Sequence, residues 1–275
     1  MVKSYIHTFT QQEQERLIHQ AEYLVPWVHR AVDFSCCKKV LEIGCGVGAQ
    51  LKILAKSFSD THFTGIDFSS EQLSRAKILL RDTITAKQVS LAKASAYELP
   101  FADSTFDGIF LCWVLEHLEH PGVAMSEAAR VLKNGGIMIA TEVFNAGLHC
   151  DPPRTALMEY WREFNLLQRE FGGHPDIGIR LATLAADCDF KDIELTPILP
   201  QLDRRLSEEK RREMADYFRG IFASGAGELV KRGRVTCELV AAMHADFDLV
   251  VSETDSVMVF TAFQVSARRR ARRVG

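Results

Sequence analysis

The sequence predicts an α/β fold built on a doubly wound, seven-stranded, mainly parallel sheet whose last strand is antiparallel. Three observations carry this prediction. Short apolar runs alternate with longer segments of helical periodicity through the first half of the chain, as they do when crossover helices join parallel strands. A glycine-rich turn, Gly44-Cys45-Gly46-Val47-Gly48, follows the first apolar run. A long apolar run, residues 256–265, lies near the C-terminus and supplies the closing strand.

The first half of the chain supplies five strands and the helices between them. Residues 11–33 carry apolar side chains at helical spacing, and Pro26 predicts a kink or an end there. The strands are predicted at residues 39–43, 61–66, 89–92, 106–113 and 137–141, and the helices at 49–57, 69–81 and 121–132. Ser69-Ser70-Glu71 and Pro121 mark two helix starts, and Lys133-Asn134-Gly135-Gly136 indicates a turn.

The second half is less regular and supplies the predicted cap. Helices are expected at residues 151–171, 179–188 and 203–247, with a strand at 191–195. We therefore predict one domain over residues 1–275. Its parts are an N-terminal lid helix at 11–33, a cofactor-binding core at 39–145 and helical cap insertions at 146–177 and 200–250.

Composition narrows the class of protein. The 275 residues are 47% hydrophobic with a formal net charge of −3, which are ordinary values for a globular chain. No apolar run is long enough to span a bilayer, and the N-terminal segment lacks the apolar stretch of a secretory signal. Seven cysteines without a CxxC pair match neither a disulfide framework nor a zinc or iron–sulfur site. We expect a cytoplasmic protein with no membrane partner and no metal.

The basic run Arg268-Arg269-Arg270-Ala271-Arg272-Arg273 stands apart from the mildly acidic remainder. Such a run is able to bind nucleic acid or another acidic surface. Because the rest of the chain offers no basic patch to extend it, we interpret the run as a solvated terminus. A nucleic-acid partner is accordingly not expected.

The glycine turn satisfies two cofactor fingerprints. Gly44, Gly46 and Ala49 fit the dinucleotide pattern G-x-G-x-x-(G/A), and Asp67 lies where a ribose-binding carboxylate is expected. An NAD-dependent oxidoreductase therefore stays open on this motif alone. Glu42, two residues before the first glycine, favours another ligand, because its carboxylate is able to pair with a cationic amino group. Nicotinamide cofactors carry no such group near the pyrophosphate, whereas S-adenosylmethionine does.

Five segments occur in a recognisable order: LEIGCGVG, GIDFSSEQL, ELPFADSTFDGIF, CWVLEHLEHP and RVLKNGG. Together they resemble the class I, Rossmann-like, S-adenosylmethionine-dependent methyltransferases, especially the ubiquinone/menaquinone-methyltransferase-like branch. The resemblance covers residues 11–145 and implies S-adenosylmethionine as the cofactor. It implies that Glu42, Gly44, Gly46 and Gly48 hold the methionine part of this donor and that Asp67 binds its ribose hydroxyls.

The resemblance also implies an adenine site. Phe68 and Gln72 would lie along the ring, and Ser95 and Ala96 would flank its edge. Three residues after the fourth strand would close the floor: Cys112, Trp113 and His117. Ser95 departs from the family pattern, since relatives commonly carry Asp there. A neutral hydroxyl still accepts a hydrogen bond from the adenine amino group, although a weaker one.

The acceptor site is expected at the carboxyl ends of the fourth and fifth strands, under the insertions. His149 and Glu142 are the candidate general bases, because Glu142 ends the fifth strand and His149 lies just beyond it. The residues expected to bind substrate are Tyr23, Trp113, Tyr160, Trp161 and His174. Three alternatives stay open: Glu142 as a cap or ion-pair partner, His149 as an exposed histidine, and Tyr160 and Trp161 as packing aromatics.

Elimination favours a small organic acceptor. Base-specific amino-methyltransferases resemble one another in an Asn/Asp-Pro-Pro-aromatic run after the fourth strand, where this chain has Cys112-Trp113-Val114-Leu115. The family-level expectation is a secondary metabolite or a quinone-like compound, methylated by direct displacement. A macromolecular methyltransferase, an NAD-dependent oxidoreductase and a non-catalytic cofactor-binding module are the alternatives. The helix at 11–33 either closes over the donor or packs against a second subunit, so a homo-oligomer also stays open.

Overall fold

A computed structural model describes residues 10–271 of the chain. Its main sheet has seven strands in the order β3-β2-β1-β4-β5-β10-β7. The strands are β1 (Lys39–Ile43), β2 (His62–Asp67), β3 (Val89–Lys93), β4 (Phe106–Cys112), β5 (Leu132–Val143), β7 (Phe190–Ile198) and β10 (Ala262–Arg269). Strand β10 runs antiparallel to both β5 and β7, and the pairs from β3 to β5 are parallel. The predicted fold class is confirmed.

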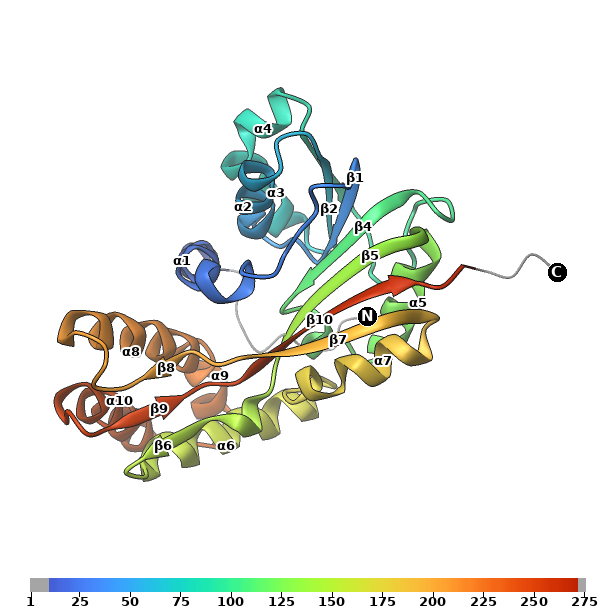
Figure 1. Cartoon of the computed structure of the whole chain (residues 1–275). Helices are drawn as coiled ribbons and strands as arrows, with labels where there is room; N and C mark the ends of the chain where they lie inside the picture. Colours follow the sequence, from blue (N-terminus) through green and yellow to red (C-terminus); the bar gives the residue numbers. More distant parts are fainter. Residues whose placement is uncertain (1–9, 272–275) are drawn as a thin grey trace.

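Helices cover both faces of this sheet (Figure 1). They are α1 (Gln11–Val28), α2 (Ala49–Ser57), α3 (Ser70–Leu79), α4 (Arg81–Thr85), α5 (Pro121–Val131) and α7 (Leu181–Asp187), with short 3-10 turns η1 (Leu115–His117), η2 (Asn145–Gly147) and η3 (Ile177–Arg180). Neighbouring residues of a strand point to opposite faces. Val40 accordingly packs with α2 and α3 in one core cluster, while Leu41 packs with α5 and α7 in another.

A cap extends from the carboxyl edge of the sheet. It contains α6 (Thr155–Glu170), α8 (Glu208–Ala223), α9 (Ala226–Lys231) and α10 (Cys237–Ser252). It also contains a second, three-stranded antiparallel sheet in the order β6-β9-β8, formed by β6 (His149–Asp151), β8 (Gln201–Leu202) and β9 (Val257–Val259). The cap contains the predicted helices and, in addition, this small sheet, which the sequence did not predict. Figure 1 shows the reason: the chain of β7 continues into β8, and β9 leads into β10, so core strands reach into the cap.

Three boundaries differ from the sequence prediction. Helix α1 contains Pro26 and ends two residues later at Val28; a proline inside a helix removes one backbone hydrogen bond and disfavours its continuation. The predicted final strand is divided into β9 and β10 by residues 260–261. Strand β5 begins at Leu132, and its pairing with β4 jumps from Leu132 to Ile137. The predicted turn at 133–136 is therefore a bulge, in which Gly135 has φ +75°.

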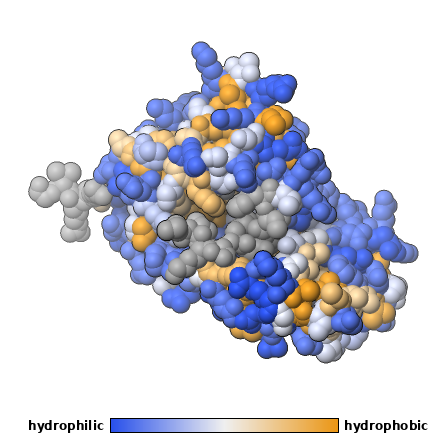
Figure 2. Space-filling view, turned by 180° about the vertical axis from the view of Figure 1, so that it is seen from behind, coloured by the Kyte–Doolittle hydropathy of each residue, from blue (hydrophilic) through white to orange (hydrophobic). Residues whose placement is uncertain are grey.

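The basic run is part of the sheet rather than a solvated tail. Arg268 and Arg269 belong to β10, and Arg269 is 3% exposed. Its guanidinium donates to the carbonyl oxygens of Leu132 and Arg130 and to the Ser104 hydroxyl. The prediction of a solvated terminus was wrong for Arg269, whereas Arg268 and Arg270 are exposed; residues 272–275 lie outside the described part. Seen from behind, the surface is largely hydrophilic (Figure 2), and no helix within residues 10–271 is long and apolar enough to cross a bilayer.

Candidate active site

The glycine turn after β1 opens a cavity at the carboxyl edge of the sheet. Gly44 and Gly46 adopt φ +73° and +50°, the left-handed region that side chains disfavour. A Cβ on Gly44 would lie 2.5 Å from Val114 Cγ2, whereas a Cβ on Gly46 would meet no atom within 4 Å. Gly44 thus allows close packing on the loop after β4, while Gly46 leaves the backbone bare toward open space. A ligand is able to approach the main chain here.

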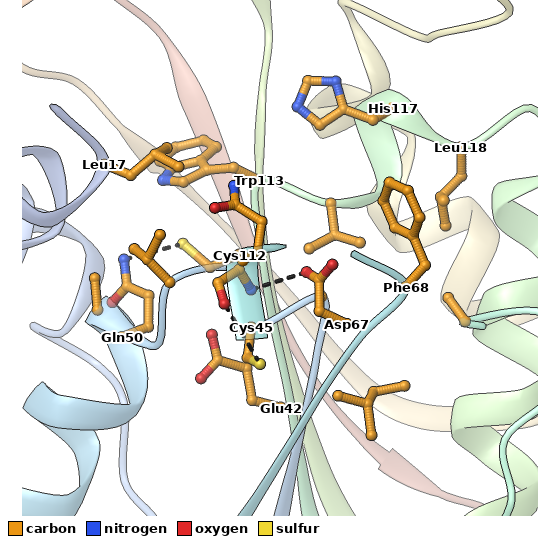
Figure 3. Close-up of a pocket in the computed structure, with 18 of the residues that line it drawn as sticks. Leu17, Glu42, Cys45, Gln50, Asp67, Phe68, Cys112, Trp113, His117 and Leu118 are labelled. Carbon is orange, nitrogen blue, oxygen red and sulfur yellow. Dashed lines mark hydrogen bonds between the residues drawn. The ribbon is translucent and has the colours of Figure 1, made fainter. Parts of the chain in front are cut away.

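The first cavity measures about 180 Å³. Residues from the ends of β1, β2 and β4 line it from the sheet side, and Leu17, Gln20 and Ala21 of α1 cover it. Figure 3 shows this arrangement, with Leu17, Trp113 and His117 above the carboxylates of Glu42 and Asp67. Because α1 forms one wall, the N-terminal helix is part of the site.

Glu42 places a buried carboxylate at the base of this cavity. The residue is 2% exposed, and its Oε2 has no hydrogen-bond partner within the described residues. Burial, and then the charge of Asp67, raise the pKa of Glu42 well above its ordinary value. A buried carboxylate without a partner is unfavourable, and a cationic group in the cavity would remove that penalty. The donor set therefore fits a ligand that brings an ammonium group.

Asp67 is fixed at the end of β2 by backbone donors. Its Oδ2 accepts from the N–H of Gly46 at 2.9 Å, and its Oδ1 accepts from the N–H of Ser69 at 2.8 Å. Burial raises the pKa of Asp67, and these hydrogen bonds lower it. Each carboxylate oxygen keeps a second lone pair. A pair of ribose hydroxyls would therefore find two oriented acceptors.

The sequence-predicted donor residues largely converge on this cavity. Its lining includes Glu42, Gly44, Gly46, Asp67, Phe68, Gln72, Ser95, Ala96, Cys112 and His117. Gly48 lies outside the lining: it begins α2 at φ +78°, where a Cβ would lie 2.6 Å from Leu80 Cδ1. Sequence reasoning missed Gln20 and Gln50, which also line the cavity. Their helical spacing marks a buried face but does not say that the face looks onto a ligand.

A second cavity of about 90 Å³ adjoins the first. Four residues line both cavities: Leu17, Gln20, Trp113 and His117. Beyond this shared wall, the lining is mainly apolar and comes from α1, the ends of β5, β7 and β10, and the cap helices α6 and α8. Its aromatic members are Trp113, Trp161, Phe164, Tyr217, Phe218 and Phe260. The two cavities thus meet between α1 and the segment that runs from the end of β4 to η1.

Glu142 holds that loop in place. The residue is fully buried; its Oε1 accepts from the N–H groups of Val114 at 2.9 Å and Leu115 at 2.7 Å, and its Oε2 accepts from that of Glu116 at 3.2 Å. These bonds secure a turn in which Trp113 adopts φ +58°. Burial and the neighbouring Glu116 raise the pKa of Glu142. Because it lines neither cavity, its contacts favour capping, which the sequence left as the alternative to catalysis.

Of the other residues predicted to contact the acceptor, some line the second cavity and others lie outside it. Trp113 and Trp161 line the second cavity. Tyr160 is fully buried in the cap, where its hydroxyl donates to the Phe222 carbonyl at 2.6 Å. His149 is exposed on β6, and His174 is exposed beside η1, where its N–H donates to the Glu116 carbonyl.

Tyr23 lies one layer behind the second cavity. Its ring stacks on Tyr217, which is one of the lining residues. His149, His174, Tyr160 and Tyr23 belong to neither lining. The geometry therefore supports Trp113 and Trp161 as acceptor contacts and gives the other four no direct contact with either space.

The fold and the site together define a class. In nicotinamide-dependent dehydrogenases the doubly wound sheet is parallel in the order 3-2-1-4-5-6, whereas here the antiparallel β10 lies between β5 and β7. With Oε2 of Glu42, which has no hydrogen-bond partner among residues 10–271, under the glycine turn, this topology defines a Rossmann-like methyltransferase of class I.

Comparison with known proteins agrees. The family model described as a methyltransferase domain matches residues 41–140. The chain is 32% identical to O-methyltransferase rstn1 of Aspergillus nomiae over 58% of this chain and 68% of that protein. It is 30% identical to phosphatidylethanolamine N-methyltransferase of Cereibacter sphaeroides over 59% and 74%, respectively. The chain belongs to the class I S-adenosylmethionine-dependent methyltransferases.

Solved structures share the fold at lower identity. The [4+2]-cyclase SpnF superposes with a TM-score of 0.55 at 20% identity, over 92% of this chain and 82% of that one. Phosphoethanolamine N-methyltransferase 2 of Haemonchus contortus superposes with a TM-score of 0.57 at 17% identity, over 96% of this chain and 58% of that one.

A further sequence relative is O-methyltransferase resE of Aspergillus sclerotiorum, which is 32% identical over 60% of this chain and 59% of that protein. The reactions that these names describe differ, so the acceptor has to be argued from the site.

Proposed function

We propose that the chain transfers the methyl group of S-adenosylmethionine to a small, mainly apolar organic acceptor that binds in the second cavity. The observation that carries this proposal is the shared wall of Leu17, Gln20, Trp113 and His117. Direct displacement needs the nucleophile and the methyl carbon about 3–3.5 Å apart and in line. Two cavities that share a wall supply this proximity without a large rearrangement.

The first cavity would hold the donor. Glu42 would pair with the ammonium of its methionine part, Asp67 would accept from the ribose hydroxyls, and Phe68 and Gln72 would lie beside the adenine. When bound, S-adenosylmethionine supplies an activated methyl group on a sulfonium centre. The chain's own contribution is to orient this donor, exclude water and receive a proton where the acceptor loses one.

The lining of the second cavity supports an acceptor with an apolar body. Aromatic and aliphatic side chains dominate it, and polar groups gather near the shared wall: Arg16, Gln20, Glu116 and His117. The names of relatives support a small acceptor as well. They include demethylmenaquinone methyltransferase of Staphylococcus aureus, 36% identical over 38% of this chain, and O-methyltransferase rstn1. A secondary metabolite or a quinone-like compound is the acceptor we propose.

The cellular location, the absence of a nucleic-acid partner and the oligomeric state are predictions. All seven thiols are free, which supports the expected cytoplasmic location, since reducing compartments keep thiols unpaired. The burial of Arg269 in β10 weakens the case for a nucleic-acid-binding tail. Helix α1 covers the donor cavity, which supports a lid rather than a subunit contact, although a homo-oligomer is still to be tested.

Calorimetric titration tests the donor site. We expect S-adenosylmethionine and S-adenosylhomocysteine to bind in the micromolar range or tighter, at about −8 kcal/mol, and NAD not to bind. Asp67→Ala should abolish most of this affinity. Binding of NAD alone would overturn the proposed function.

A larger side chain that fills the second cavity tests whether the acceptor binds there. Ile221 of α8 lines this cavity, so Ile221→Trp should block methyl transfer to a screened panel of hydroxylated aromatics and hydroquinones while leaving donor binding intact. The matched control is Leu249→Trp, an exposed position of α10 that lines neither cavity. Equal transfer by Ile221→Trp and the control would contradict the assignment of this cavity.

A further inference from the structure

Asn145 places a polar atom in the mainly apolar lining of the second cavity. The residue belongs to η2, just after β5, and is 3% exposed. It lines the second cavity and not the first. Its carboxamide oxygen Oδ1 is buried and has no hydrogen-bond partner within residues 10–271. Because a buried carbonyl without a partner is unfavourable, a ligand group that donates to Oδ1 would remove this penalty.

The rest of Asn145 is held in place by hydrogen bonds. Its Nδ2 donates to Oδ1 of Asn165 at 2.7 Å, and its backbone N–H donates to the carbonyl of Pro175 at 2.9 Å. Its own carbonyl accepts from Nε1 of Trp161 at 3.0 Å. Since Nδ2 is directed to Asn165, Oδ1 is the amide atom left for another partner. An acceptor atom fixed in this way is suited to selecting ligands, because little conformational freedom is lost when it binds one.

The same lining contains a second buried polar atom of the same kind. It is Nε1 of Trp113, which donates and does not accept. Within the described part of the chain, no other buried side-chain nitrogen or oxygen of this lining lacks a hydrogen-bond partner. Trp113 belongs to the wall shared with the first cavity, whereas Asn145 lies outside that wall. A ligand that satisfies both atoms therefore carries two polar groups, one beside the first cavity and one at Asn145.

The neighbours of Asn145 in the lining favour a neutral ligand group. Val143 lies two residues earlier on β5, and Ala262 pairs with Val143 across the sheet. Both line the second cavity, as does Trp161. These three side chains carry no charge that would stabilise an ion taken out of water. A carboxamide oxygen accepts and does not donate, so an ether or carbonyl group gains nothing from it. A neutral hydroxyl or N–H group is the partner that fits.

We propose that Asn145 is a specificity-determining residue, whose carboxamide oxygen accepts a hydrogen bond from a neutral hydroxyl or N–H group of the acceptor. This group is not the one that is methylated. The inference rests on the proposed function of the two cavities and deepens it, because it assigns the acceptor to compounds with two polar groups on one apolar body. One group receives the methyl beside the shared wall, and Asn145 holds the other away from the donor.

Two matched naphthalenes test this proposal by binding alone. Naphthalene-2,7-diol carries two hydroxyl donors, whereas 2,7-dimethoxynaphthalene carries two ether oxygens and no donor. Each is titrated by calorimetry into protein saturated with S-adenosylhomocysteine. Asn145→Leu, which is similar in size and has no polar side-chain atom, should weaken binding of the diol by about tenfold or more. Binding of the dimethoxy compound should stay within about twofold, because that compound gives Oδ1 no hydrogen bond. The comparison is between variants, so the different sizes of the two probes cancel.

Further variants separate recognition from a general loss of structure. Asn145→Asp keeps an acceptor oxygen at the same position and should keep the tighter binding of the diol. Asn134→Leu makes the matched substitution at an exposed position that lines neither cavity and should change neither affinity. Circular dichroism and thermal melting report the folding of each variant, and Asn145→Ala carries the test if Asn145→Leu does not fold. Naphthalene-2,7-diamine, titrated in the same way, distinguishes an N–H partner from a hydroxyl partner by which probe loses more affinity.

The outcomes distinguish this inference from the proposed function. If the folded Asn145→Leu variant binds the diol and the diamine as tightly as the unmodified protein does, or loses the dimethoxy compound to the same extent, the role of Asn145 is overturned alone. Failure of every naphthalene to bind, while S-adenosylhomocysteine binds, would overturn the assignment of the second cavity and this inference with it. Failure of S-adenosylhomocysteine to bind at all would overturn the proposed donor site.

Discussion

Tyr23 of α1 stacks on Tyr217 of α8, with ring centroids 4.7 Å apart and planes 28° from parallel. This contact joins the N-terminal helix, which covers the cavity proposed for the donor, to the cap, which supplies much of the cavity proposed for the acceptor. In Figure 1, α1 lies between the core layer of α2 and α3 and the cap helix α8. The two cavities are therefore closed by one connected wall, and its integrity depends on an aromatic pair.

Replacing Tyr23 with Ala should impair turnover more than stability. A stacked aromatic pair contributes about 0.5–1.5 kcal/mol, so the free energy of unfolding should fall by roughly 1 kcal/mol, or somewhat more with the lost packing. Because Tyr217 lines the acceptor cavity, kcat/KM should fall by about tenfold or more, given how strongly transfer depends on alignment. Tyr23→Phe retains the ring and should restore both values. Parallel losses in urea unfolding and in kcat/KM would refute the lid interpretation of α1.

Glu142 should prove a structural residue. Glu142→Ala removes the acceptor of three backbone N–H groups and leaves them buried, which should lower the free energy of unfolding by about 3 kcal/mol or more. Donor affinity should fall as well, because Trp113 and His117 lie at the two ends of the released loop. Urea unfolding and calorimetry measure the two effects.

Glu142→Gln is the conservative comparison. Its amide oxygen is able to keep the bonds to Val114 and Leu115, so most of the stability should return. A general base would behave differently: the amide would abolish turnover while the fold and donor binding stayed intact. That pattern would restore Glu142 as the catalytic residue.

The sequence was sufficient to place most of the predicted donor residues around one cavity, for physical reasons. Gly44, Gly46 and Asp67 act through backbone geometry and a short loop, so their roles follow from residues close together in the chain. The mainly parallel sheet follows from alternating strands and helices. Local patterns were therefore sufficient to predict the fold class and most of the lining of the first cavity.

The acceptor side depends on distant segments, which a local pattern does not bring together. Leu17, Trp161 and Tyr217 come from α1, α6 and α8, and only tertiary packing places them around one space. Glu142 had the position expected of a base, but its carboxylate points at the backbone of the next loop. His117 was expected in the donor floor, and its second face toward the acceptor cavity became visible only with the cap in place.

Arg269 should be the stabilising residue of the basic run. Arg269→Ala removes a buried guanidinium that ties β10 to the carbonyl groups of Arg130 and Leu132, and it should cost about 2–4 kcal/mol in unfolding free energy. Arg268→Ala is the matched control, since that side chain is exposed and donates to Gly135 at 3.0 Å. The control should change stability by roughly 0.5 kcal/mol or less. Equal effects in chemical denaturation would contradict this division.

Glu42 should make the stability of the donor-free protein depend on pH. Its folded pKa lies well above the ordinary value of 4.5, so the folded state holds a proton that the unfolded state has released. Stability from this group is therefore complete below pH 4.5 and is lost as pH rises toward the folded pKa. Glu42→Gln removes the charge, and its melting temperature should exceed that of the unmodified protein by a margin that grows with pH across this window.

Donor binding should reverse that order. An ammonium in the cavity stabilises the ionised carboxylate, so S-adenosylhomocysteine should raise the melting temperature of the unmodified protein more than that of Glu42→Gln. The lost charge-assisted contact corresponds to about 1.5–3 kcal/mol, or roughly ten- to a hundredfold in dissociation constant. Binding by the unmodified protein should also weaken as pH falls through the raised pKa, because the protonated carboxyl no longer attracts the ammonium. An affinity that is independent of pH and unchanged in Glu42→Gln would show that the ammonium binds elsewhere.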